Sequence, residues 1–136
     1  MEIDEARDFL REHRRAVLAT FRSDGGLQMC PVLTTVDDEG RAIVSTRETA
    51  MKTKNLRRDP RAFLCVFTNA FFGDWVRVDG TAEIVSLPDA MEPLVDYYRR
   101  VAGEHDDWDD YREAMRKEQR ALLRITIEEA GPDVAG

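Results

Sequence analysis

Basic side chains gather in one short stretch of an otherwise acidic chain. Residues 41–67 contain seven lysines and arginines against only Glu48 and Asp59, whereas the whole chain of 136 residues has a net charge of -7. The same stretch predicts a short helix between two apolar strands. The start of a helix offers free N–H groups and the positive end of the helix dipole, and both attract anions. The pattern therefore predicts a binding site for a small anion, such as a phosphate, at this corner.

Composition limits the classes of function. Hydrophobic residues at 43% and charged residues at 35% are typical of a globular protein. The negative net charge disfavours general nucleic-acid binding, because that requires a broad basic surface. No apolar run is long enough to span a membrane, and the first residues lack the apolar region of a signal peptide. We therefore expect a cytoplasmic protein without membrane or nucleic-acid partners.

The spacing of the cysteines, acidic residues and serines does not indicate a metal site or an acyl-transfer enzyme. Cys30 and Cys65 lack the spacing of a metal site, and Cys65 lies in an apolar run that favours a buried, inert thiol. The acidic run around His105 lacks the spacing of a calcium loop and instead suits the first turn of a helix. No serine has the context of a nucleophile elbow. We therefore predict that the protein has no metal-binding site.

Hydrophobic periodicity predicts a mainly β, α+β fold. Alternating patterns predict six strands, at residues 16–22, 27–36, 41–46, 61–68, 74–86 and 121–127. Helices are expected at residues 3–10, 88–102 and 108–117, and a short one after an N-cap at Thr49 that ends before Pro60. Gly80 predicts a bulge or bend in the long fifth strand.

The order of these elements predicts a small antiparallel barrel, closed or partly closed. A barrel of six strands has little room inside. A large cofactor would have to lie outside it, in a groove between subunits, so we expect a homodimer. Residues 1–130 are expected to form a single domain, followed by a frayed tail at residues 131–136.

Four segments together carry a family resemblance: AVLATFRSDGGLQMCPV, MKTKNLRRDPRAFLCV, WVRVDGTAEI and AGEHDDWDDYREAM. In this order and spacing they resemble the split-barrel flavin and deazaflavin proteins related to pyridoxamine 5'-phosphate oxidase. The chain is most similar to their actinobacterial branch, which binds coenzyme F420. The resemblance covers almost the whole chain. It implies a six-stranded split β-barrel with peripheral helices, which forms a homodimer with the cofactor at the subunit interface.

The resemblance also implies which residues contact the cofactor. These are the ring-side strand residues Cys30, Pro31, Val32 and Leu33, the linking residues Ser45 and Thr46, the phosphate-binding Lys52 with Lys54 and Asn55 on the same helix, and Trp75, which would pack on the ring from the second subunit. One departure concerns the phosphate site. Relatives carry an arginine at one of the two positions where this chain has Ala50 and Met51, which leaves Arg47 or Lys54 to assist Lys52.

A flavin or deazaflavin brings its own redox chemistry, so the resemblance implies no catalytic residue in the protein. It implies an oxidoreductase that passes a hydride from reduced coenzyme F420 to a conjugated, electron-poor small molecule. FMN is the alternative cofactor, because it also presents a phosphate near a tricyclic ring. A non-catalytic F420 carrier is the second alternative. Pyridoxamine phosphate oxidation itself is not expected, because the chain lacks the C-terminal Arg–His segment of relatives with that activity.

Taken without the resemblance, the same residues have a plainer interpretation. Lys52, Lys54 and Arg57 are equally typical of the solvated face of a helix. Trp75, at the start of a strand, is as often a core or interface aromatic as a ligand contact.

Overall fold

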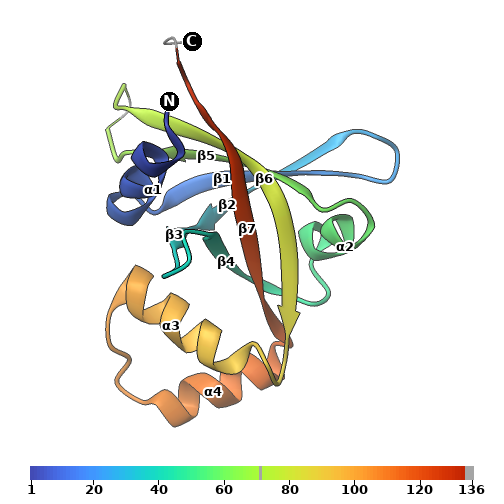
Figure 1. Cartoon of the computed structure of the whole chain (residues 1–136). Helices are drawn as coiled ribbons and strands as arrows, with labels where there is room; N and C mark the ends of the chain where they lie inside the picture. The colour runs from blue at the N-terminus through green and yellow to red at the C-terminus, as the bar shows by residue number, and fades with distance from the viewer. Residues whose placement is uncertain (71, 134–136) are drawn as a thin grey trace.

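The computed structural model describes residues 1–70 and 72–133 (Figure 1). Its elements follow the chain in this order: α1 (Ile3–Glu12), β1 (Arg15–Phe21), β2 (Leu27–Leu33), β3 (Thr35–Val36), β4 (Ala42–Arg47), α2 (Met51–Arg58), β5 (Arg61–Phe67), β6 (Trp75–Ser86), α3 (Met91–Ala102), α4 (Trp108–Lys117) and β7 (Arg120–Gly131). None of the helices in the described ranges has the length and apolar character that a membrane span requires.

The strands form one antiparallel sheet that curls into a partly closed barrel. The order across the sheet is β2-β1-β5-β6-β7-β4-β3. β2 and β3 stand at opposite ends of this order, yet only Thr34 separates them along the chain. The two ends of the sheet therefore approach one another, which confirms the predicted α+β split barrel.

The number of strands differs from the prediction. The strand expected over residues 27–36 is divided at Thr34, so the described sheet has seven strands and not six. β2 pairs with β1, whereas β3 pairs with β4. Between them, the Thr34 amide donates to the carbonyl of Arg14 (2.8 Å) and its hydroxyl donates to that of Ile43 (3.1 Å). Thr34 and Thr35 are both typical strand residues, so no local signal marks the point where the chain changes its pairing partner.

Several element boundaries also differ. Thr49 is not the N-cap of α2: Ala50 takes that place and makes no side-chain hydrogen bond. α3 begins at Met91 rather than at residue 88, and β7 continues to Gly131, four residues past the expected end. Gly131 is therefore part of the sheet and not of the predicted tail at 131–136, whose residues 134–136 lie outside the described residues. The bulge predicted at Gly80 is confirmed by a register shift between Asp79 and Gly80.

Two hydrophobic cores use opposite faces of β4 and β7. Successive side chains of a strand point to opposite sides of a sheet. On β4, Ala42 and Val44 pack inside the barrel while Ile43 packs beneath the helices, and on β7 Leu123 lies inside while Leu122 lies outside. The second core joins these outer side chains to apolar residues of α3 and α4. The helix pair is thus held against the barrel wall at one end of the molecule (Figure 1).

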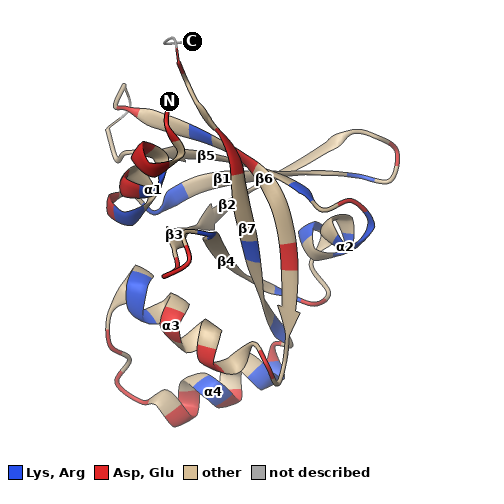
Figure 2. Ribbon diagram, viewed as in Figure 1, with Lys and Arg blue, Asp and Glu red and all other residues tan. Residues whose placement is uncertain are grey.

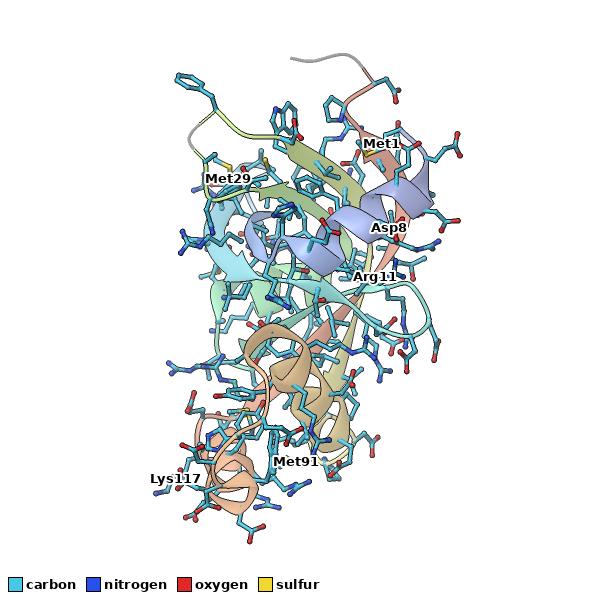
Figure 3. All side chains as sticks on the ribbon, turned by 90° about the vertical axis from the view of Figure 1, so that its left-hand side faces the viewer. Met1, Asp8, Arg11, Met29, Met91 and Lys117 are labelled. Carbon is cyan, nitrogen blue, oxygen red and sulfur yellow. The ribbon has the colours of Figure 1, made fainter. Side chains whose placement is uncertain are left out.

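A second outer face, over β2, β1 and β5, carries large apolar side chains at the surface. Exposed residues there include Leu27, Met29, Leu33 and Phe67, and Trp75 lies beside them at the start of β6. The strand registers place Leu33, Arg15, Phe67 and Trp75 in one row across four strands. Figure 3 shows Met29 at the barrel end of the molecule, while Met91 and Lys117 lie at the opposite, helical end. A contiguous exposed apolar face of this kind is typical of a protein interface.

Candidate functional site

A cavity of about 510 Å³ lies between the helix pair and the barrel wall. Small-molecule sites commonly have volumes of about 300–1,000 Å³. Two residues of the predicted cofactor set, Leu33 and Ser45, line this cavity together with Tyr97, Tyr98, Val101, Ala102, His105, Asp110, Tyr111, Ala114, Met115, Glu118 and Arg120. The fold therefore brings the ends of β2 and β4 to the edge of an open cavity that α3 and α4 line on the other side.

The helical side of the cavity is aromatic. The Tyr98 ring lies 5.0 Å from that of Tyr111 and 5.2 Å from that of His105, measured between ring centroids. Trp108 packs against the same cluster at 5.5–5.7 Å. Sequence reasoning did not assign these residues to a site. The high density of aromatic residues in the two helices could have indicated such a site. Only the packing of these residues shows that they form one wall of the cavity.

Two tyrosine hydroxyls hold the helix pair in place. Tyr97 donates to the carbonyl of Leu33 (2.8 Å), and Tyr111 donates to that of Leu94 (2.9 Å). Burial raises the pKa of Tyr97, and it raises the pKa of Tyr111 to about 12. Both phenols therefore stay protonated at neutral pH and remain hydrogen-bond donors. The bond from Tyr97 ties the end of β2 to α3.

We expect Tyr97→Phe to lower the free energy of unfolding by about 1 kcal/mol, the usual net contribution of one hydrogen bond. Urea unfolding followed by circular dichroism would measure the change. Tyr98→Phe is the matched control, because the Tyr98 hydroxyl makes no hydrogen bond in the described part of the chain. Equal stability losses in the two variants would contradict this role for Tyr97.

The polar side of the cavity is a charge cluster in which Glu118 contacts two arginines. Arg120 contacts Glu118 through Nη2 at 2.8 Å, and Arg47 approaches the same carboxylate at 3.3 Å. The hydrogen bond from Arg120 holds the pKa of Glu118 below its ordinary value. The carboxylate is therefore ionised at neutral pH and offsets the charge of Arg120.

The start of α2 is fastened to the end of β4. The hydroxyls of Thr46 and Thr53 lie 3.0 Å apart, and Thr53 also donates to the carbonyl of Arg47 (2.6 Å). α2 contains no acidic residue, and no side chain caps it. Figure 2 shows this contrast: α2 carries only basic charges, whereas acidic residues dominate α1 and the start of α4. The first turn of α2 therefore keeps its affinity for an anion.

Among the basic residues of this corner, Lys52 and Lys54 have no ion pair within residues 1–70 and 72–133. Arg57 pairs with Glu48, and Arg58 donates to the carbonyl of Phe21 (2.7 Å). The two arginines are thus already engaged within the chain. The lysines are the cations left to bind a ligand.

Two residues of the predicted cofactor set face the interior. Asn55 is only 1% exposed, donates to Thr20 Oγ1 (3.1 Å) and accepts from Arg58 (3.1 Å). Thr46 is equally buried and is held by Thr53. The side chains of Asn55 and Thr46 therefore position α2 on the barrel and are not at the surface.

The predicted ring-side residues of β2 alternate between two faces. Pro31 and Leu33 are exposed on the outer face, whereas Cys30 and Val32 are half-buried and point toward the barrel interior. Any ligand lying along β2 can thus contact the side chains of one pair only. Leu33 is the member of this group that also lines the cavity under α3 and α4.

Trp75 lies far from α2 within one chain. It pairs with Phe67, at the end of β5, whereas α2 directly precedes the start of β5. Seven strand residues span about 20 Å, and Figure 1 shows α2 and the start of β6 well apart. Trp75 instead borders a separate cavity of about 380 Å³ with Arg15, Cys65 and Phe67. Phe71 of the neighbouring loop lies outside the described residues.

The chain matches a family model over nearly its whole length. The model describes pyridoxamine 5'-phosphate oxidase, and the match covers residues 3–132. The matched region includes every residue of the predicted cofactor set.

Solved structures share the fold. A conserved hypothetical protein, Rv2991 from Mycobacterium tuberculosis, is 26% identical, with a TM-score of 0.78 over 100% of this chain and 93% of that one. A protein described as an F420 reductase is 19% identical, with a TM-score of 0.72 over 92% and 94% of the two chains. A heme binding protein from Mycobacterium smegmatis is 18% identical, with a TM-score of 0.70, and covers 94% of this chain and 52% of its own. The last two carry different ligands in their names, so at this distance the likeness shows the fold alone.

Proposed function

Because the chain belongs to the pyridoxamine 5'-phosphate oxidase family, we propose that it is an oxidoreductase that works with a bound flavin-type cofactor. The cofactor that we propose is coenzyme F420, with FMN as the alternative. The observation that carries the proposal is the meeting of three features at the end of β4. Ser45 lines the cavity, Thr46 clamps the uncapped start of α2, and Lys52 stands there without an ion pair.

These residues suit a ligand with an anionic group and a planar apolar part. The ammonium of Lys52 and the first turn of α2 would hold the phosphate that F420 and FMN share. Ser45 would lie between the phosphate and the ring, and Leu33 would contact the ring. Lys54 is the second cation available in place of the missing arginine at Ala50 or Met51. Binding of the phosphate depends on cations that are not paired within the chain, and Lys52 and Lys54 meet this condition among the described residues.

The cofactor supplies the hydride chemistry when bound. The protein's part is to bind, to orient and to exclude water. Lys52 would hold the anionic end, and the end of β4 would set the distance from that anchor to the ring. The aromatic wall of α3 and α4 gives the neighbouring cavity an apolar side. The hydride step requires no proton from a protein side chain, and solvent can supply the proton that completes the reduction.

Titration of the purified apoprotein with F420 and with FMN tests the proposal. We expect saturable binding of F420, followed by fluorescence or calorimetry, and weaker binding of FMN; the reverse order would establish FMN as the cofactor. Reduced F420 should then be consumed in the presence of quinones, enones or nitro compounds faster than in buffer. Tight binding without turnover on any of these acceptors would favour the carrier function instead.

The proposal includes a homodimer. The exposed apolar face over β2, β1 and β5 is the surface that we expect the second copy to cover. The distance between α2 and Trp75 supports this arrangement, because a cofactor anchored at Lys52 would meet Trp75 only from the second subunit. Apolar area on this face would provide most of the association free energy.

We expect Met29→Glu to convert the dimer to a monomer and to weaken cofactor binding at the same time. Met29 is 64% exposed, so the substitution leaves the folded monomer intact but places a charge on the apolar face, where dimer formation would bury it. Sedimentation velocity would measure the change. Lys117→Gln, at the far end of the molecule (Figure 3), alters the net charge by the same amount and should remain dimeric. A monomeric wild-type protein would contradict the proposal.

A further inference from the structure

We propose that the cavity between α3, α4 and the barrel wall is the binding site of the hydride acceptor, and that it selects an uncharged, planar, conjugated molecule. This inference rests on the proposed function and adds to it the place and the chemical class of the acceptor. The cavity shares Leu33 and Ser45 with the predicted cofactor residues, so an occupant would lie directly beside the cofactor.

The shape of the cavity fits a flat aromatic or quinone-like molecule. Its volume of about 510 Å³ accommodates two or three fused rings beside the helices. Tyr98, Tyr111 and His105 form one aromatic wall, with Val101 and Met115 beside them. Aromatic side chains prefer offset or edge-to-face contact with other rings, so a planar conjugated ligand can pack against this wall.

The charges around the cavity disfavour an anion. Arg120 is the one cation among its lining residues in the described chain, and it is already paired with Glu118. Asp110 adds a second carboxylate to the lining. An anionic ligand would therefore meet two carboxylates and one lining cation, whose Nε and Nη2 already donate to Glu118.

The same lining offers neutral hydrogen-bond donors for a carbonyl oxygen. The amide of Asp107 donates to Nδ1 of His105 (2.9 Å), so this nitrogen carries no proton and Nε2 carries it. Ser45, whose hydroxyl is also an uncharged donor, lines the cavity from β4, on the barrel wall. Uncharged donors on an apolar wall are suited to orient a conjugated carbonyl compound without requiring charge on it.

Calorimetric titration with two thiol-inert probes tests the inference: a hydroxymethyl anthraquinone and a sulfonated anthraquinone. We expect the wild-type protein to bind the uncharged probe at least tenfold more tightly. Ala102→Phe should weaken that binding at least tenfold, because Ala102 lines the cavity from an exposed position where a larger side chain is compatible with folding. Lys117→Phe, which adds the same ring at an exposed position of α4 outside the cavity lining, is the control and should bind normally.

Glu118→Gln provides a test that a misfolded variant cannot imitate. The substitution removes the partner of Arg120, and the freed guanidinium should raise affinity for the sulfonated probe at least tenfold while leaving the uncharged probe nearly unchanged. Equal binding of the two probes to the wild type, or binding unaffected by Ala102→Phe, would overturn the inference.

The proposed function is tested separately, by titrating F420 into the same variants. If F420 binds normally and Ala102→Phe leaves the affinity for the uncharged probe unchanged, then only the assignment of the cavity is overturned. Failure of F420 and FMN to bind, with the probe results as expected, would overturn the proposed function and leave the cavity as a site for uncharged planar ligands.

Discussion

Replacing Lys52 with glutamine should weaken cofactor binding at least tenfold. Lys52 has no ion pair in the described ranges, and it stands in the first turn of a helix that no side chain caps. A hydrogen bond to a charged group contributes about 1.5–3 kcal/mol, which corresponds to a factor of about ten or more in affinity. Fluorescence titration of the apoprotein with F420 would measure the effect.

Two comparisons make this result interpretable. Lys117→Gln removes the same charge from the far end of α4 and should leave cofactor affinity unchanged. The affinity of the wild type should also fall as salt is added, and that dependence should be smaller in Lys52→Gln. If Lys52→Gln binds F420 as tightly as the wild type, then the lysines of α2 form only a solvated helix face and the phosphate site lies elsewhere.

Gly80→Ala should destabilise the protein by about 3 kcal/mol, a large fraction of the 5–15 kcal/mol that typically holds a domain together. A Cβ atom at Gly80 would lie 2.1 Å from the carbonyl oxygen of Thr126 and 2.8 Å from Cγ2 of Ile125. The backbone contact cannot be relieved by rotating a side chain. Alanine would therefore force β6 and β7 apart at the bulge, where the register shifts.

Urea unfolding would show this loss as a lower midpoint with little change in slope. Gly131→Ala is the matched control on β7, because the atoms nearest to its Cβ would belong to the Arg77 side chain, at 3.5 Å or more, which is an ordinary contact. We expect the control to change stability by less than about 0.5 kcal/mol. Similar midpoints for the two variants would show that β6 and β7 accommodate a Cβ atom at Gly80 without loss of stability, which would contradict the prediction.

Local patterns in the chain predict most of the architecture. Period-two alternation located the strands, and the residue before Pro60 marked the end of α2, because both signals act over a few neighbouring residues. Gly80 indicated the bulge for the same reason. The basic corner at Lys52 was also visible, since helix start and cations are close together in the chain.

The break at Thr34 and the burial of Asn55 depend on contacts between residues that lie far apart in the chain. Nothing local divides the strand at Thr34, because the break comes from a change of pairing partner between β1 and β4. Asn55 reads as a surface residue of a basic helix, yet its amide bonds to Thr20, 35 residues earlier in the chain.

The cavity is the clearest example of a feature that local sequence patterns do not predict. Its aromatic wall and its charge pair come from α3, α4 and β7, while Leu33 and Ser45 reach it from β2 and β4. Periodicity predicts which face of each element is apolar, but not which faces meet. That choice follows from how the curled sheet presents the outer sides of β4 and β7 to the helix pair, and such long-range packing leaves no mark on spacing along the chain.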